Sequence, residues 1–204
     1  MFYKNLFSDA VSEKSFGVLS AVTKSYFINS SENIPTYRWI QFGLNPVGDA
    51  EMPIYTDTPK FFSNAKVTIA GTNKIRVTTG DAGEAKICVM SSKDMGKTYY
   101  SVAEAVSDTT FTEVEPSVTI CLTKQNYIPR VFVVNSLHLQ NTTVLSATDT
   151  QADAIYIGSS VTKSQAEGPV KIASQNAKYT GSSIIFEPEI TIEENSNIEF
   201  NNLK

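Results

Sequence analysis

Residues 66–91 read KVTIAGTNKIRVTTGDAGEAKICVMS, and this stretch decides the fold. Apolar and polar residues alternate along it with a period of two, as they do in half-buried β-strands, and glycine, asparagine and aspartate interrupt the alternation as turn residues. The same rhythm continues downstream. It predicts strands at 66–70, 74–78, 85–91, 99–106, 110–114, 117–123 and 130–134. Seven short strands in about seventy residues are typical of an immunoglobulin-like sandwich, which we place at 62–135.

The alternation also predicts which side chains face the core of this sandwich. The expected inward set is Val67, Ile69, Ile75, Val77, Ile87, Val89, Val118, Ile120 and Leu122. Cys88 and Cys121, the only cysteines, alternate with inward residues and should therefore point outward. They fall on the third and sixth strands, which are neighbours in such a fold. They are either a cross-strand pair within bonding reach or two unrelated free thiols.

The segments on either side of the sandwich have different patterns. Residues 136–204 contain short β-branched pieces at 154–157, 170–173, 183–186, 190–192 and 198–200. We interpret this segment as a small stack of β-arches, like a few coils of a solenoid, with a second small sandwich as the alternative. In residues 1–59, an apolar stripe predicts one helix at 12–26, with Ser12 as its N-cap and Asn29, Ser30 and Ser31 ending it. Residues 37–44 are aromatic and apolar and predict a buried strand.

The sequence thus predicts a mainly β protein with a short N-terminal α/β remnant, an immunoglobulin-like sandwich and a β-rich C-terminal module. Its bulk composition limits the partners. Lys and Arg number 17 against 21 Asp and Glu, which leaves no basic surplus for binding nucleic acid. No stretch approaches the roughly 20 apolar residues that span a bilayer, and the first residues lack the apolar core of a signal peptide.

One stretch is more specific than these patterns. Residues 37–59 read YRWIQFGLNPVGDAEMPIYTDTP and resemble the end of the catalytic domain of gingipain-like cysteine peptidases, family C25. That family closes its caspase-like domain with a Gly-Asp-Pro-x-x-Pro-Ile/Leu stretch and a Thr-x-Thr-Pro exit, although Ala50 stands here where the family usually has proline. An immunoglobulin-like domain then follows and ends in a segment like TKQNYIP at 123–129. The tail, with IGSSVT at 157–162, is similar to the β-rich modules of secreted proteins from the same bacteria.

The resemblance implies a peptidase family without supplying a catalytic centre. The family's mechanism needs a Cys nucleophile and a His base, because the base generates the attacking thiolate. Residues 1–59 contain neither type, so no catalytic residue is carried over. The resemblance implies secretion or a bacterial cell surface, as part of a precursor. It leaves two functions open: a non-catalytic fragment with a structural, adhesive or protein-binding role, or part of an active endopeptidase whose Cys/His half lies upstream or on another chain.

Other residues that could carry chemistry have simpler interpretations. His138, the only histidine, lies in an apolar run and is expected to be a partly buried linker or strand residue rather than a base, and one histidine argues against zinc. The carboxylates are expected on solvated strand faces or turns rather than in a glycosidase or Ca²⁺ site. They are Glu113, Glu115, Glu187, Glu189, Glu193, Glu194, Asp49, Asp81 and Glu84.

Four aromatic residues form a last group. Tyr99, Tyr100, Phe61 and Phe62 are interpreted as packing residues rather than as a glycan or peptide site, with the two phenylalanines between modules. The glycosylation sequons at Asn29 and Asn141 carry no weight in a bacterial protein. We therefore predict no cofactor, no metal and no catalytic residue in this chain. The partners left open are a protein, a surface glycan, an upstream peptidase domain or a second copy.

Overall fold

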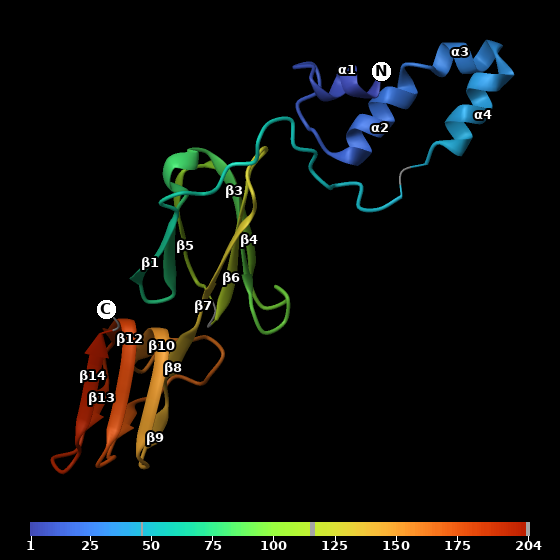
Figure 1. The fold of residues 1–204 in the computed structure, drawn as a ribbon. Coiled ribbons are helices and arrows are strands. Elements are labelled where there is room, and N and C mark those ends of the chain that lie inside the picture. The colour runs from blue at the N-terminus through green and yellow to red at the C-terminus, as the bar shows by residue number, and fades with distance from the viewer. Residues whose placement is uncertain (46, 115–116, 203–204) are drawn as a thin grey trace. The chain divides into compact units, whose positions relative to one another are not determined.

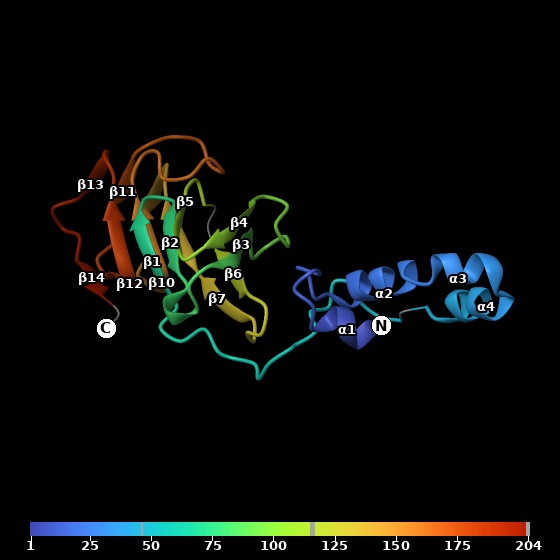
Figure 2. The same ribbon diagram turned by 90° about the horizontal axis from the view of Figure 1, so that it is seen from above.

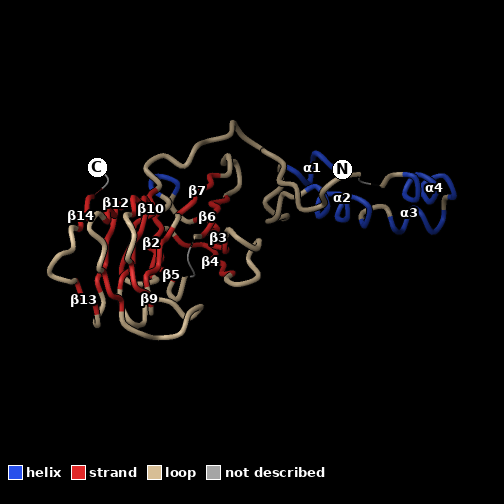
Figure 3. Tube along the Cα trace, turned by 90° about the horizontal axis from the view of Figure 1, so that it is seen from below, coloured by secondary structure: helices blue, strands red, loops and turns tan. Residues whose placement is uncertain are grey.

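The computed structural model describes residues 1–45, 47–114 and 117–202 (Figure 1). The chain divides into two compact units. The first, the helical unit, comprises Met1–Lys60 with Lys124–Ile128, and the second comprises Phe61–Thr123 with Pro129–Lys204. All four α-helices of the described residues lie in the first unit, whereas strands dominate the second (Figure 3). The predicted mainly β fold class with a short helical N-terminal part is confirmed.

The helical unit contains α1 (Phe2–Leu6), α2 (Phe16–Ser25), α3 (Ile28–Asn33) and α4 (Pro35–Gly43). The predicted helix at 12–26 corresponds to α2, which buries Leu19 completely. This helix begins later than expected, because Ser15 rather than Ser12 has the extended backbone of an N-cap.

Two expectations for the helical unit were wrong. Residues 37–44 are not a strand but belong mostly to α4, and none of the described residues of α4 is buried. Pro35 occupies the first turn, where its fixed φ suits a helix and its missing N–H costs nothing. Asn29, Ser30 and Ser31 do not end a helix but lie within α3, where the Ser31 hydroxyl donates to the Phe27 carbonyl at 2.9 Å.

Residues 54–60 continue the helical unit as an extended segment held by the chain at 124–128. The Gln125 amide donates to the Ile54 carbonyl at 2.7 Å, and the Asn126 side-chain oxygen accepts the Thr56 N–H at 2.8 Å. The Lys60 N–H donates to the Asn126 carbonyl, and the Ile128 N–H donates to the Lys60 carbonyl, both at 2.9 Å. Backbone and side-chain hydrogen bonds thus join residues 54–60 to residues 124–128, two segments that contribute to the family resemblance.

The second unit begins with two antiparallel sheets. One has the order β1-β2-β5 and the other β4-β3-β6-β7. The strands are β1 (Lys66–Gly71), β2 (Lys74–Thr78), β3 (Ala85–Ser91), β4 (Tyr100–Val106), β5 (Asp108–Phe111), β6 (Val118–Thr123) and β7 (Arg130–Val134), with one 3₁₀ turn, η1, at Gly80–Ala82. All seven predicted strands are present, and most ends agree within two residues. The division into three and four strands is that of an immunoglobulin-like sandwich.

The inward-facing residues agree with the alternation read from the sequence. Ile75, Val77, Ile87, Val89, Val118, Ile120 and Leu122 are buried. Val67 and Ile69 on β1 are only half-buried, because β1 is an edge strand. As expected, β3 and β6 are neighbours, and Cys88 and Cys121 are half-buried between the inward positions.

The rest of the second unit is a parallel β-solenoid (Figure 2). Its strands are β8 (Ser136–Leu139), β9 (Thr142–Val144), β10 (Thr148–Ile157), β11 (Val170–Ile172), β12 (Ala177–Phe186), β13 (Ile190–Ile192) and β14 (Ile198–Asn202). They form the parallel sheets β14-β12-β10-β8 and β13-β11-β9. The pairs β8/β9, β10/β11 and β12/β13 each contribute one strand to each sheet, and β14 adds a fourth strand to the first sheet. This arrangement supports the stacked coils rather than the second sandwich. The expected ranges 62–135 and 136–204 differ in fold type but share one compact unit.

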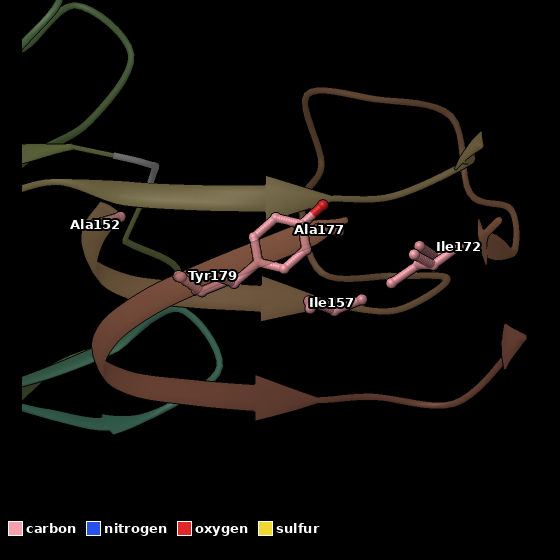
Figure 4. Close-up of a cluster of buried hydrophobic side chains, with 7 residues drawn as sticks. Ala152, Ile157, Ile172, Ala177 and Tyr179 are labelled. Carbon is pink, nitrogen blue, oxygen red and sulfur yellow. The ribbon is translucent and has the colours of Figure 1, made fainter. Parts of the chain in front are cut away.

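The solenoid core lies between its two sheets. It is built from aliphatic side chains and from the stacked rings of Tyr179 and Phe200. Ile157, Ile172 and Tyr179 are buried there with Ala152 and Ala177 (Figure 4). The opposite face of β10 is buried as well. Ala154 and Tyr156 form a second cluster with Val161, and Ile69 of the sandwich packs against it. Strand β10 thus serves both the solenoid core and the contact between solenoid and sandwich.

Candidate functional site

The helical unit exposes most of its large apolar side chains. Leu6 and Leu19 are the buried apolar residues among its described helical positions. We call the exposed set the aromatic surface: Tyr3, Phe7, Tyr26, Ile28, Ile34, Tyr37, Trp39, Ile40, Phe42 and Leu44. Trp39 is 74% exposed and Phe42 66% exposed. Single exposed apolar residues are ordinary, but their number on one small unit makes this surface a candidate for binding.

Polar contacts hold the helices together and leave these side chains outward. The Arg38 guanidinium donates to the carbonyls of Ser31 and Glu32, both at 3.1 Å, and so satisfies free carbonyls near the end of α3. The Gln41 amide donates to the Lys24 carbonyl of α2 at 3.2 Å. Tyr37 of α4 also stacks on Phe27, with 5.8 Å between the ring centroids, so Trp39 and Phe42 are the aromatic side chains that α4 offers to a partner.

A second exposed surface is the outer face of the sandwich sheet β4-β3-β6-β7. Two rows of side chains cross this face from β4 to β7. The first is Val102, Cys88, Cys121 and Val131, and the second is Tyr100, Met90, Thr119 and Val133. Tyr100, Val131 and Val133 are each more than half exposed. The outward direction predicted for the two cysteines is confirmed, and both are free thiols.

The two thiols have different surroundings. Burial raises the pKa of the Cys121 thiol, and the charge of Cys88 adds to the effect. The pKa of Tyr100 is raised, first of all by its interaction with the neighbouring Cys88. Ionisation of Cys121 is thus opposed by its burial and by a charge on Cys88.

His138 lies on β8 in the contact between solenoid and sandwich. Its Nε2 is 2.8 Å from the Asn73 side-chain oxygen, and its ring stacks on Tyr156 with 4.7 Å between centroids. Burial, helped by Lys93, lowers the pKa of His138 to about 4, and burial raises the pKa of Tyr156 to about 12. Its Nδ1 is buried and has no hydrogen-bond partner in the described part of the chain. The half-buried strand position matches the expected one, and the neutral ring packs between the two β-parts.

Gln140 is a buried polar residue that the sequence did not point to. It follows β8, is 1% exposed, and holds the loop at 159–168 between β10 and β11. Its Oε1 accepts the N–H groups of Val161 and Thr162 at 2.6 and 2.9 Å. Its Nε2 donates to the carbonyls of residues 162, 165 and 166 at 3.0–3.1 Å. Since the pattern requires the coils to be stacked, no local sequence signal could have revealed it.

The candidate carboxylates are dispersed. Glu113 pairs with Lys163 at 3.1 Å and Glu193 with Lys171 at 2.6 Å, while Glu187 accepts the Thr72 hydroxyl at 2.5 Å. The other described carboxylates are exposed: Asp49, Asp81, Glu84, Glu189 and Glu194. Glu115 lies outside the described residues. The described residues contain no group of three or more potential metal ligands.

The four candidate aromatics do not gather into one site. Phe62 is buried, and its carbonyl accepts the Arg130 guanidinium at 3.0 Å, whereas Phe61 is 70% exposed. Tyr99 is half-buried and its hydroxyl donates to the Thr112 carbonyl, while Tyr100 belongs to the outer sheet face. The sequon residue Asn29 lies in α3, and Asn141 lies between β8 and β9.

Searches of protein-family models, of curated proteins and of solved structures found no match to this chain. Within the described residues, no helix is both long and apolar enough to cross a membrane. The fold and the two exposed surfaces therefore supply the physical grounds for a function.

Proposed function

We propose that this chain is the non-catalytic end of a gingipain-like cysteine peptidase and that it works by binding protein. The helical unit docks on the part of the peptidase that carries the Cys nucleophile and the His base. That part is an upstream segment or a separate chain. The sandwich and the solenoid form the attached β-module, which has a structural or adhesive role in secretion or at the bacterial surface.

The aromatic surface of the helical unit is the observation that carries this proposal. A helix that is separated from the rest of its peptidase domain should expose the side chains that pack against that domain. Trp39 and Phe42 on α4 are exposed in this way. Both lie in the stretch 37–59 that resembles the end of the catalytic domain. Burying side chains of this size contributes about 1.5–3 kcal/mol each, so a few of them suffice for a stable complex.

The test uses Trp39, the only tryptophan of the chain, as a reporter. The chain is labelled with 5-fluorotryptophan and titrated with the gingipain-like Cys/His region encoded upstream, expressed as a separate polypeptide. Docking moves the ¹⁹F resonance and protects the indole from a solvent paramagnetic agent. A resonance that stays unchanged at saturating concentration of that region would refute the proposal.

Two matched variants identify the surface. Phe42→Ser removes an exposed ring from α4 and should weaken the complex at least tenfold, the loss of about 1.4 kcal/mol or more. Phe186→Ser removes an exposed ring of the solenoid, 52% exposed, and should leave the affinity unchanged. Peptidase activity measured on each mixture then separates the two versions. Activity that appears only with the chain present supports a completed enzyme, and binding without activity supports the structural or adhesive role.

A further inference from the structure

Cys88 and Cys121 lie directly opposite each other on adjacent antiparallel strands. The register pairs them between Ile87 with Leu122 and Val89 with Ile120. Directly opposed residues of antiparallel strands have Cα atoms about 4.5 or 5.5 Å apart. A disulfide spans Cα separations of about 4.4–6.8 Å, so the register brings the two Cα atoms within the range that a disulfide needs.

The surroundings of the two thiols suit a reactive pair rather than a structural core. Both are free and half-buried, on the solvent side of the sheet. Val102 flanks Cys88 on β4 and Val131 flanks Cys121 on β7. Both flanking side chains are apolar, and the pKa of Tyr100 is raised by its interaction with Cys88.

We propose that Cys88 and Cys121 form a thiol–disulfide exchange site that reacts with low-molecular-weight disulfides, such as oxidised glutathione, and closes into a reversible cross-strand disulfide. Cys88 is the attacking thiol and Cys121 the resolving one. The site is independent of the aromatic surface and of the docking proposed for it, because it belongs to the outer sheet face of the sandwich.

The reaction balances with the small disulfide as oxidant. The Cys88 thiolate attacks one sulfur of oxidised glutathione, whose S–S bond breaks and releases one glutathione thiolate. The Cys121 thiolate then attacks Sγ of Cys88, which breaks the mixed disulfide and releases the second glutathione thiolate. The two protons lost by the cysteines go to the two released thiolates. Because burial raises the pKa of Cys121, its thiolate is the scarcer one in solution and reacts efficiently only with a sulfur held opposite it.

The test follows the full-length reduced chain after addition of oxidised glutathione, with intact-mass spectrometry and alkylation of the remaining thiols. The wild-type chain should lose the mass of two hydrogen atoms, become resistant to alkylation at both cysteines and carry no lasting adduct. Cys121→Ser should keep a stable glutathione adduct on Cys88. That adduct should form several-fold faster than the adduct on Cys121 in Cys88→Ser.

Three results would overturn the inference. They are a wild-type chain that ends with glutathione on both cysteines, one that forms only disulfide-linked dimers at low protein concentration, and one that does not react. Equal or reversed rates in the two single variants would overturn the assigned order of attack. The double variant Cys88→Ser/Cys121→Ser controls for non-specific effects, since oxidant should raise the unfolding temperature of the wild type and leave that of the double variant unchanged.

Discussion

Replacing Gln140 with leucine tests whether this one buried amide holds the loop at 159–168. The amide accepts two N–H groups and donates to three carbonyls, but its two protons allow only two full bonds on the donor side. About four effective bonds at a net 1 kcal/mol each give about 4 kcal/mol. Leucine keeps the volume and removes all of them, so the N–H groups of Val161 and Thr162 lose their partners.

The cost should appear as local opening of the loop rather than as global unfolding. An open loop returns the orphaned N–H groups to water and gives up the burial of Val161, which is worth about 2 kcal/mol. The closed loop instead keeps unsatisfied buried donors, at about 1–3 kcal/mol each. Opening is the cheaper outcome, so the free energy that keeps the loop shut falls by up to about 4 kcal/mol.

Amide hydrogen exchange measures this directly. At about 1.4 kcal/mol per factor of ten, protection of the Val161 and Thr162 amides should fall by up to about a thousandfold in Gln140→Leu. The amides of Ile155 in β10 should keep their protection. Gln175→Leu, at an exposed corner of the solenoid, is the matched control and should change neither. Wild-type protection of Val161 in Gln140→Leu would refute the reasoning.

Three further predictions concern stability and are checked by urea unfolding. Gly80 and Gly83 both have φ +63°, so alanine costs about 1–3 kcal/mol of backbone strain at either position. Only at Gly80 would the new Cβ also meet a backbone oxygen, at 2.2 Å, so its loss of stability should be the larger, and equal losses would contradict this. The His138 ring is neutral in the folded chain, because its pKa there is about 4, whereas in the unfolded chain it is protonated near pH 6.5. Its contribution to the free energy of unfolding is therefore complete above pH 6.5 and is lost as the pH falls towards 4. The change is at most about 3 kcal/mol, reduced by partial exposure, and should vanish in His138→Gln. Ile155→Ala in the solenoid core should cost about 2–5 kcal/mol, and Ile192→Ala, 52% exposed, far less.

The sandwich could be predicted from the sequence because its information is local. Strands β2, β3 and β6 alternate buried positions with more exposed ones, so a period of two can be read without knowing the strand's partner. The outward direction of Cys88 and Cys121 follows from the same parity. Their direct opposition required the strand register, which the structure supplied.

The stacked coils of residues 136–204 were predicted, but the helical unit and the bounds of the solenoid strands were not, for different reasons. The aromatic run at 37–44 fits a buried strand or a helix equally well by composition, and Pro35 was the signal that could have decided for the helix. The polar first halves of β10 and β12 carry little strand propensity. They are strands because β10 and β12 pair with each other, from Thr148 with Ala177 to Ile157 with Phe186, and β14 pairs with the first half of β12 from the other side. That support exists only once the coils are stacked.

The burial of both faces of β10 explains why sandwich and solenoid form one unit. Ile155 and Ile157 fill the core between the solenoid sheets, while Ala154 and Tyr156 on the other face pack with Val161. An exposed second face would have required polar residues at these positions, as in a free solenoid coil. Instead the apolar side chain of Ile69, the His138–Asn73 hydrogen bond and the Gln140-held loop close over Tyr156. The apolar residues on the second face of β10 therefore encode the contact between solenoid and sandwich. The two form a single β-module, which would be attached as one body to the peptidase part in the proposed complex.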